Sequence, residues 1–160
     1  MDFEDRLERA IHRGQRRSEA RQKEAHARQL SEEEFKRLHS QFRLKVSEHI
    51  ESCLKRLPNH FPGFTLETLF GDRGWGAACS RDDIRMVDGR RANDYSRLEM
   101  SVRPFSSYHV LELTTKGTVR NKEIFNRTYF EKLDEVDLDK FMELVDTWIL
   151  EYAELYAARH

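Results

Sequence analysis

Cysteine and histidine are the residues of this chain with the widest chemistry, and it has two of the first and seven of the second. Cys79 lies in the segment Ala-Ala-Cys-Ser-Arg-Asp-Asp, where a reactive thiolate would need a histidine or a helix N-terminus close by. Trp75, four residues earlier, would line the same candidate pocket. Cysteine is, however, among the most often buried residue types, so a small core residue is the simpler interpretation of Cys79.

The histidines are dispersed along the chain and form neither an HxxxH motif nor a Cys–His zinc signature. His49 and Cys53 are four residues apart, so on a helix they would share one face and offer half of a metal site. The same two positions fall on an apolar seam, where both side chains can simply pack. The sequence therefore predicts no metal and no cofactor.

Other catalytic patterns are also weak. The glycines of residues 71–76 match neither a P-loop nor a dinucleotide fingerprint. Asp82-Asp83 and Asp134-Glu135 are sequential acidic pairs, whereas a hydrolytic dyad needs two carboxylates that face one cavity. We therefore assign no catalytic residue.

The patterned charge in the chain is basic and lies near its N-terminus. On a helix these side chains would form a stripe able to follow phosphate groups, although aromatic residues for stacking are absent around them and acidic residues partly neutralise the stripe. A pI of 6.7 is low for a dedicated nucleic-acid-binding domain. The candidate partner-binding residues are Arg6, Arg9, Arg13, Arg16, Arg17 and Lys23.

Composition limits the class of protein. A chain of 160 residues has the size of one domain, and ten Phe, five Tyr and two Trp can supply a core. Residues 1–30 contain eight basic and six acidic side chains, whereas residues 131–160 contain three and nine. Two cysteines without a CxxC motif, an acidic N-terminus without an apolar segment, and no long apolar run predict a cytoplasmic protein without a secretory signal or membrane span.

Two helices, or one long helix, are expected in the N-terminal third. Residues 2–29 have only a short apolar stripe, and i,i+4 acid–base pairs would support that helix locally. Ser31 and Glu34 form a capping box that Leu30 and Phe35 flank as a hydrophobic staple, which predicts a helix start there. Residues 31–57 carry a continuous apolar seam, and Pro58 is expected to end it, with residues 58–63 as the connection.

An antiparallel sheet should follow, because the apolar period changes from about 3.6 to 2. The pattern predicts a strand, with a short helix as the alternative, over 64–70 and a turn at 71–74. Strands are predicted over 75–86 and 98–102, separated by a polar loop at 87–94. A further strand begins at His109, and Lys116-Gly117 is expected to turn the chain into a last strand over 119–130.

The C-terminal helix is expected from Asp137, which can cap it, and its broad apolar face suits packing on a sheet. The predicted fold is α+β, with a long N-terminal helical segment, a meander of four or five antiparallel strands, and a C-terminal amphipathic helix on the sheet. Residues 1–30 would be a charged helical arm and residues 31–160 a single domain.

This layout broadly resembles small bacterial chaperone and adaptor domains, such as type III secretion chaperones, at the level of the fold. We expect a non-catalytic interaction, adaptor or chaperone-like protein whose helices mediate contacts, with a homodimer as the expected form. The alternative is a nucleic-acid-associated protein that uses the basic N-terminal helix. A third hypothesis is an enzyme with a pocket near Trp75 and Cys79.

Overall fold

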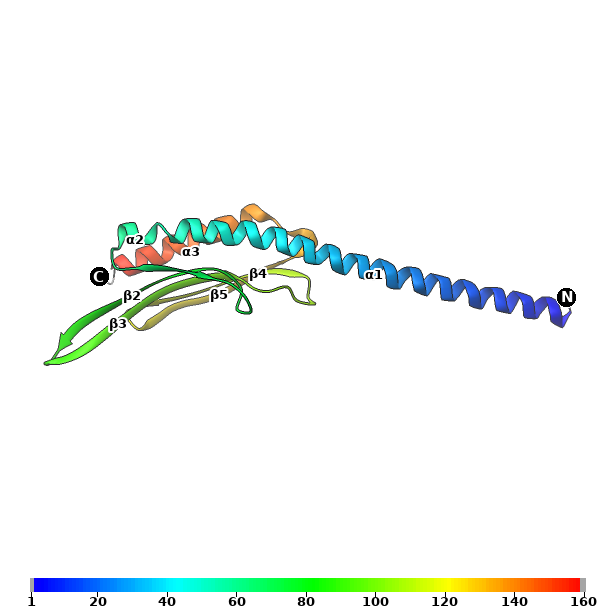
Figure 1. The fold of residues 1–160 in the computed structure, drawn as a ribbon, viewed down its shortest axis with the longest axis horizontal. Coiled ribbons are helices and arrows are strands. Elements are labelled where there is room, and N and C mark those ends of the chain that lie inside the picture. The colour runs from blue at the N-terminus through cyan, green and yellow to red at the C-terminus, as the bar shows by residue number, and fades with distance from the viewer. Residues whose placement is uncertain (1, 159–160) are drawn as a thin grey trace. The chain divides into compact units, whose positions relative to one another are not determined.

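The computed structural model describes residues 2–158, with the side chains of residues 27–30 outside that description. The chain divides into two compact units, Met1–Arg37 and Leu38–His160. Its elements, drawn in Figure 1, are α1 (Phe3–Leu54), α2 (Leu57–His60), β1 (Thr65–Leu69), β2 (Trp75–Val87), β3 (Arg90–Val102), β4 (Val110–Val119), β5 (Lys122–Lys132), a 3-10 turn at Leu133–Glu135 and α3 (Leu138–Ala158).

The first unit consists of the N-terminal part of α1. Asp2 caps this helix, because its carboxylate accepts a hydrogen bond from the amide of Asp5 at 2.9 Å. The side chains from Asp2 to His26 are all exposed. Helix formation over residues 2–26 therefore depends on weak local interactions within the helix and not on burial of these side chains.

The N-terminal third forms one long helix, one of the two forms that the sequence allowed. The backbone is helical from Phe3 to Leu54, so Ser31 does not start a new helix. No glycine or proline occurs between residues 15 and 57, and without one the capping box does not interrupt the helix. The staple partner Leu30 lies outside the described side chains, and the predicted boundary at residue 30 stays a prediction.

The second unit is built on a five-stranded antiparallel meander in the order β1-β2-β3-β4-β5. The register pairs Ala77 with Met100 and Leu113 with Tyr129, so one face of the sheet collects the apolar side chains. α3 and the C-terminal part of α1 cover that face, as Figure 1 shows. Their buried residues form the core against the sheet: Val46, Ile50, Leu54, Phe141, Val145, Trp148, Ile149, Tyr152 and Tyr156.

The predicted α+β fold is thus confirmed, with five strands and the C-terminal helix on the sheet. The cap of α3 is confirmed as well, because Asp137 accepts a hydrogen bond from the Lys140 amide at 3.3 Å. Among the described residues, no helix combines the length and the apolar character that crossing a bilayer requires.

Three local predictions are wrong. Pro58 does not open a loop but lies in the first turn of the short helix α2, where its missing amide hydrogen is no loss. Residues 87–94 are not a loop, because Asp88 and Gly89 form a two-residue turn with φ of 53° and 74° and β3 begins at Arg90. Lys116-Gly117 is not the next turn; the chain reverses at Arg120 and Asn121, whose φ values are 48° and 71°.

Candidate functional site

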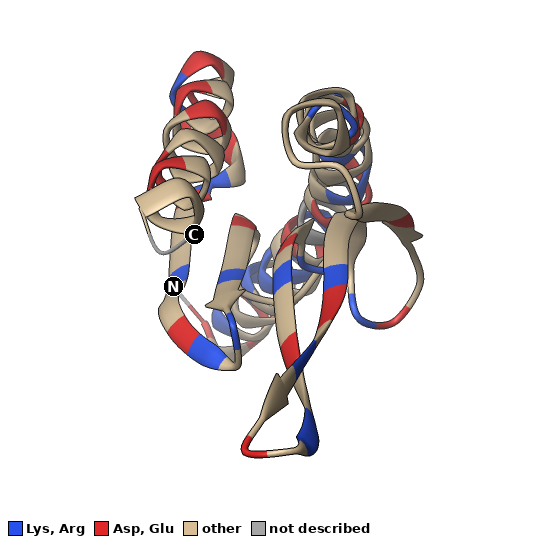
Figure 2. Cartoon of the chain, turned by 90° about the vertical axis from the view of Figure 1, so that its left-hand side faces the viewer, with Lys and Arg blue, Asp and Glu red and all other residues tan. Residues whose placement is uncertain are grey.

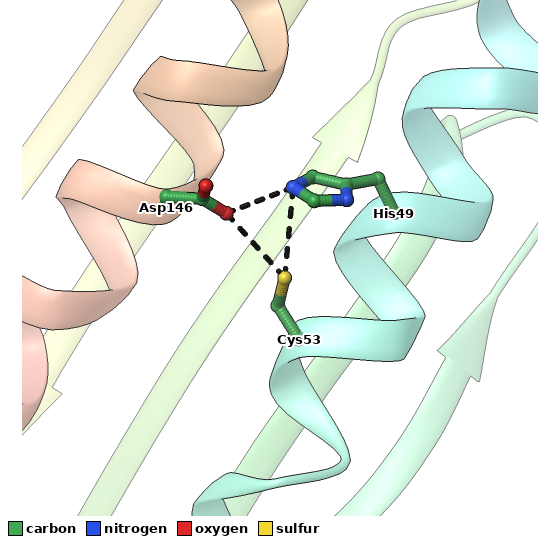
Figure 3. Close-up of side chains that lie close together, drawn as sticks. All are labelled: His49, Cys53 and Asp146. Carbon is green, nitrogen blue, oxygen red and sulfur yellow. Dashed lines mark hydrogen bonds and ion pairs between the residues drawn. The ribbon is translucent and has the colours of Figure 1, made fainter.

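Three chemically active side chains meet between the two long helices of the second unit. His49 and Cys53 are one turn apart on the same face of α1, and Asp146 comes from α3. Close packing of both helices on the sheet, through Ile50 and Val145 among others, holds these faces together. We call these three residues the His49–Cys53–Asp146 cluster, which is drawn in Figure 3.

The three polar atoms form a small triangle. Nε2 of His49 lies 2.8 Å from Oδ1 of Asp146 and 3.6 Å from Sγ of Cys53. Sγ of Cys53 lies 3.5 Å from the same Oδ1. Figure 3 shows all three side chains pointing toward one another. One point in space is therefore within reach of a nitrogen, a sulfur and an oxygen.

The environment keeps the Cys53 thiol protonated at neutral pH. Partial burial raises the pKa of Cys53, and the hydrogen bond to Asp146 and the negative charge of that carboxylate raise it further, against a smaller opposing effect of Arg56. The thiol donates to Asp146 in this state. The site stays accessible, since the side chains of His49 and Asp146 are 30% and 52% exposed.

This arrangement does not suit a Cys–His–Asp nucleophile relay. In such a relay one imidazole nitrogen contacts the nucleophile while the other contacts the carboxylate. Here the same nitrogen, Nε2 of His49, faces both Sγ and Oδ1. A raised thiol pKa also opposes formation of the thiolate that attacks a substrate.

A hollow of about 370 Å³ opens beside the cluster. Cys53 and Asp146 lie in its wall, and Arg56 adds a positive charge. The remaining lining is mostly apolar and comes from Leu57, His60, Ile149, Leu150 and Ala153. A small molecule or an exchangeable water can therefore reach the cluster from this side.

The pocket predicted around Trp75 and Cys79 is part of the packed face of the sheet. Cys79 is fully buried, and its thiol donates to the carbonyl of Leu54 at 3.2 Å. Burial raises the pKa of Cys79 to about 11. The guanidinium of Arg43 lies over the Trp75 ring, 4.1 Å from its centroid. These contacts give both residues packing roles, and a protonated, buried thiol is a poor nucleophile.

The candidate basic residues of the N-terminal helix, from Arg6 to Lys23, are exposed. Exposed with them are three large apolar side chains on the same stretch, Phe3, Leu7 and Ile11, with accessible fractions of 71%, 40% and 52%. The helix thus presents apolar and charged groups together. The structure leaves the roles of the basic residues as predictions.

Asp146 is the member of the cluster that sequence reasoning missed. The spacing of His49 and Cys53 indicated half a site, but Asp146 lies 97 and 93 residues further along the chain. It is exposed, as expected for an acidic residue at the edge of an apolar seam. Asp146 lies beside α1 because of how the two helices pack on the sheet, and no local sequence pattern encodes that packing.

Comparisons of the chain with protein-family models, with curated proteins and with solved structures gave no match. The function of the chain is therefore inferred from its own side chains.

Proposed function

We propose that this protein is a non-catalytic interaction or adaptor protein that associates through its helices, with a homodimer as its working form. The observation that carries the proposal is the exposed apolar stripe of Phe3, Leu7 and Ile11 near the start of α1. These residues repeat at intervals of four, so they lie along one side of the helix. A helix that shows such a stripe gains stability when another surface covers it.

The charges flanking the stripe favour a second copy of the same helix, in the antiparallel direction. Residues 2–8 contain four acidic side chains and one arginine, whereas residues 9–17 contain four arginines and no acid. Two antiparallel copies would place the acidic segment of each against the basic segment of the other. Two parallel copies would place like charges side by side, which is unfavourable.

The size of the stripe predicts a modest affinity. Three side chains from each copy, at roughly 1.5–3 kcal/mol each when fully buried, provide roughly 9–18 kcal/mol. Association itself costs about 4–15 kcal/mol. The midpoints of these two ranges differ by about 4 kcal/mol, which corresponds to a dissociation constant of about 1 mM, so experiments should extend from micromolar to millimolar concentrations.

Sedimentation equilibrium of the full chain tests the proposal. We expect the average mass of the wild type to rise from monomer toward dimer with concentration, and the double variant Leu7→Gln/Ile11→Gln to remain a monomer. Leu44→Gln is the matched control, because Leu44 is 53% exposed on the same helix but lies outside the stripe. A monomeric wild type throughout, or a double variant that still dimerises, would reject the proposal.

Nucleic-acid association is the second candidate, favoured by the exposure of the basic side chains of α1. Fluorescence anisotropy with a duplex oligonucleotide at several salt concentrations tests it. Replacing Arg13, Arg16 and Arg17 with alanine should weaken binding. The slope of the logarithm of the binding constant against the logarithm of the salt concentration should become shallower by about 0.9 for each phosphate that an arginine no longer neutralises. Leu7→Gln/Ile11→Gln should leave this binding unchanged, and an intact protein without salt-sensitive binding would exclude the candidate.

A further inference from the structure

We propose that the His49–Cys53–Asp146 cluster is a binding site for a divalent metal ion of the zinc class, with three protein ligands and an open fourth position. The inference rests on the meeting of imidazole, thiol and carboxylate at one point of the second unit. It is independent of the self-association proposed above.

The donor set selects the class of metal. An imidazole nitrogen, a thiolate and a carboxylate oxygen are the ligand types of Zn²⁺ and of Co²⁺, its common spectroscopic substitute. Ca²⁺ and Mg²⁺ prefer oxygen ligands only, so a site with sulfur and nitrogen discriminates against them. Among the described residues, this is the group of His, Cys, Asp or Glu side chains whose ligand atoms all lie within 4.8 Å of one another.

The spacing of the donor atoms is close to that of a tetrahedral site. With bonds of about 2.0–2.3 Å, two ligands of a tetrahedral zinc ion lie about 3.3–3.8 Å apart. The distances from Sγ of Cys53 to Nε2 of His49 and to Oδ1 of Asp146 are 3.6 and 3.5 Å. The distance between Nε2 and Oδ1 is 2.8 Å, a hydrogen bond that must open by about half an ångström to admit the ion.

The charges also fit a divalent cation. A deprotonated Cys53 and an ionised Asp146 contribute two negative charges, which the ion balances, while a neutral His49 contributes none. The thiol proton and any proton on Nε2 leave for solvent when the metal binds, so each ligand offers a free lone pair. Arg56, whose positive charge already acts against the rise in the Cys53 pKa, favours the thiolate form that the ion needs.

The fourth position faces a space that can hold a water or a small ligand. The hollow of about 370 Å³ begins at Cys53 and Asp146, two of the three proposed ligands. Three protein ligands with one exchangeable position are the pattern of open zinc sites, whereas structural sites have four protein ligands. Because the ligands come from two helices, a bound ion also links α1 to α3 above the face of the sheet that both helices cover.

Titration of the full chain with ZnCl₂ by calorimetry, and with CoCl₂ by absorption spectroscopy, tests the site. We expect one ion per chain, visible d–d bands of tetrahedral Co²⁺, and the charge-transfer band of a cobalt–thiolate bond. Cys53→Ala should abolish the charge-transfer band. His49→Ala and Asp146→Asn should each weaken zinc binding beyond the roughly 10–100-fold loss that follows removal of an outer-shell partner.

Two variants serve as matched controls. Glu143→Gln removes an exposed carboxylate one turn before Asp146 on α3, and Cys79→Ala removes the other thiol of the chain. Both should bind zinc as the wild type does and, when loaded with cobalt, keep the charge-transfer band. The proposal is wrong if the wild type binds zinc no more tightly than Cys53→Ala, or if the charge-transfer band is lost in Cys79→Ala and kept in Cys53→Ala. The cluster is then a hydrogen-bonded contact between helices.

Discussion

Gly117 shows how one residue in a strand decides whether a helix can pack on the sheet. A Cβ atom at this position would lie 2.8 Å from the Phe125 ring and 3.1 Å from the Tyr152 ring, which is closer than packed atoms approach. Tyr152 also donates from its hydroxyl to the carbonyl of Thr118 at 2.7 Å, so the ring has little freedom to move away. The glycine that looked like a turn residue in the sequence is therefore a packing residue.

Gly117→Ala should destabilise the protein by about 1–3 kcal/mol, because the added methyl group overpacks the contact with both rings. Urea unfolding followed by circular dichroism measures the effect. Gly14→Ala is the control, since a Cβ atom there meets nothing within 4 Å and alanine favours a helix by about 0.5–1 kcal/mol. Equal midpoints for Gly117→Ala and the wild type would contradict this account of the packing.

His39 gives the second unit a pH dependence near neutrality. This side chain is 3% exposed, and its Nε2–H donates to the carbonyl of Arg103 at 3.1 Å. Burial lowers the pKa of His39, an effect that the hydrogen bond to Arg103 opposes and the positive charge of Arg43 reinforces. The unfolded chain therefore takes up a proton at a higher pH than the folded chain does.

The free energy of unfolding should accordingly decrease as the pH falls below about 6.5, the usual pKa of histidine. For one proton this decrease is limited to about 1.4 kcal/mol per pH unit. His39→Gln keeps an NH donor for the Arg103 carbonyl but cannot titrate. Urea unfolding of both proteins between pH 7.5 and 5.5 should give a shallower pH dependence for the variant. Parallel curves for the two proteins would exclude this role of His39.

At the scale of elements, the hairpin between β4 and β5 shows why its turn was missed in the sequence. The turn between β4 and β5 depends on Asn121, whose side chain accepts from the Tyr95 amide at 2.9 Å and donates to the Asn93 carbonyl at 2.8 Å. These bonds tie the turn to the neighbouring strand β3. Local sequence favoured Lys116-Gly117 because glycine is the usual turn residue, whereas Asn121 reaches positive φ with the help of tertiary contacts.

Two substitutions at Asn121 separate backbone strain from hydrogen bonding. Asn121→Ala should cost about 2–3 kcal/mol, since it removes the side-chain hydrogen bonds to Tyr95, Asn93 and Asp94 and strains the backbone at a φ of 71°. Asn121→Gly should cost about 1 kcal/mol less, because glycine relieves the strain without restoring the bonds. Urea unfolding would contradict this account if both variants were as stable as the wild type.

The elements themselves were largely predictable, because each one is encoded locally. Alternating Leu98, Met100 and Val102 predicted a strand, and the seam from Phe141 to Tyr152 predicted α3. The cluster was only half predictable: i,i+4 spacing joined His49 to Cys53, but the approach of Asp146 depends on how α1 and α3 pack in register on the sheet. Sites formed within one element can be read from sequence, whereas sites between elements need the fold.

At the scale of the whole molecule, acidic and basic charge are separated along the chain. Acidic side chains mark α3, the helix that ends at the C label in Figure 2, and one of them completes the proposed metal site. The first unit has its own separation, with acidic residues at 2–8 and arginines at 9–17. We infer that this second pattern directs self-association.

A mixing experiment with charge-reversed chains tests that claim most directly. One variant carries Glu4→Arg, Asp5→Arg and Glu8→Arg, and the other carries Arg13→Glu, Arg16→Glu and Arg17→Glu. In each variant alone, residues 2–8 and residues 9–17 have net charges of the same sign, so two copies should repel one another. Circular dichroism must first show that both variants keep the helix content of the wild type.

Sedimentation of the two variants separately and as an equimolar mixture provides the measurement. We predict monomers for each variant alone and a heterodimer in the mixture. In the mixture, opposite charges face each other along residues 2–17 of the two chains. A mixture that sediments as two monomers, under conditions in which the wild type dimerises, would contradict the account.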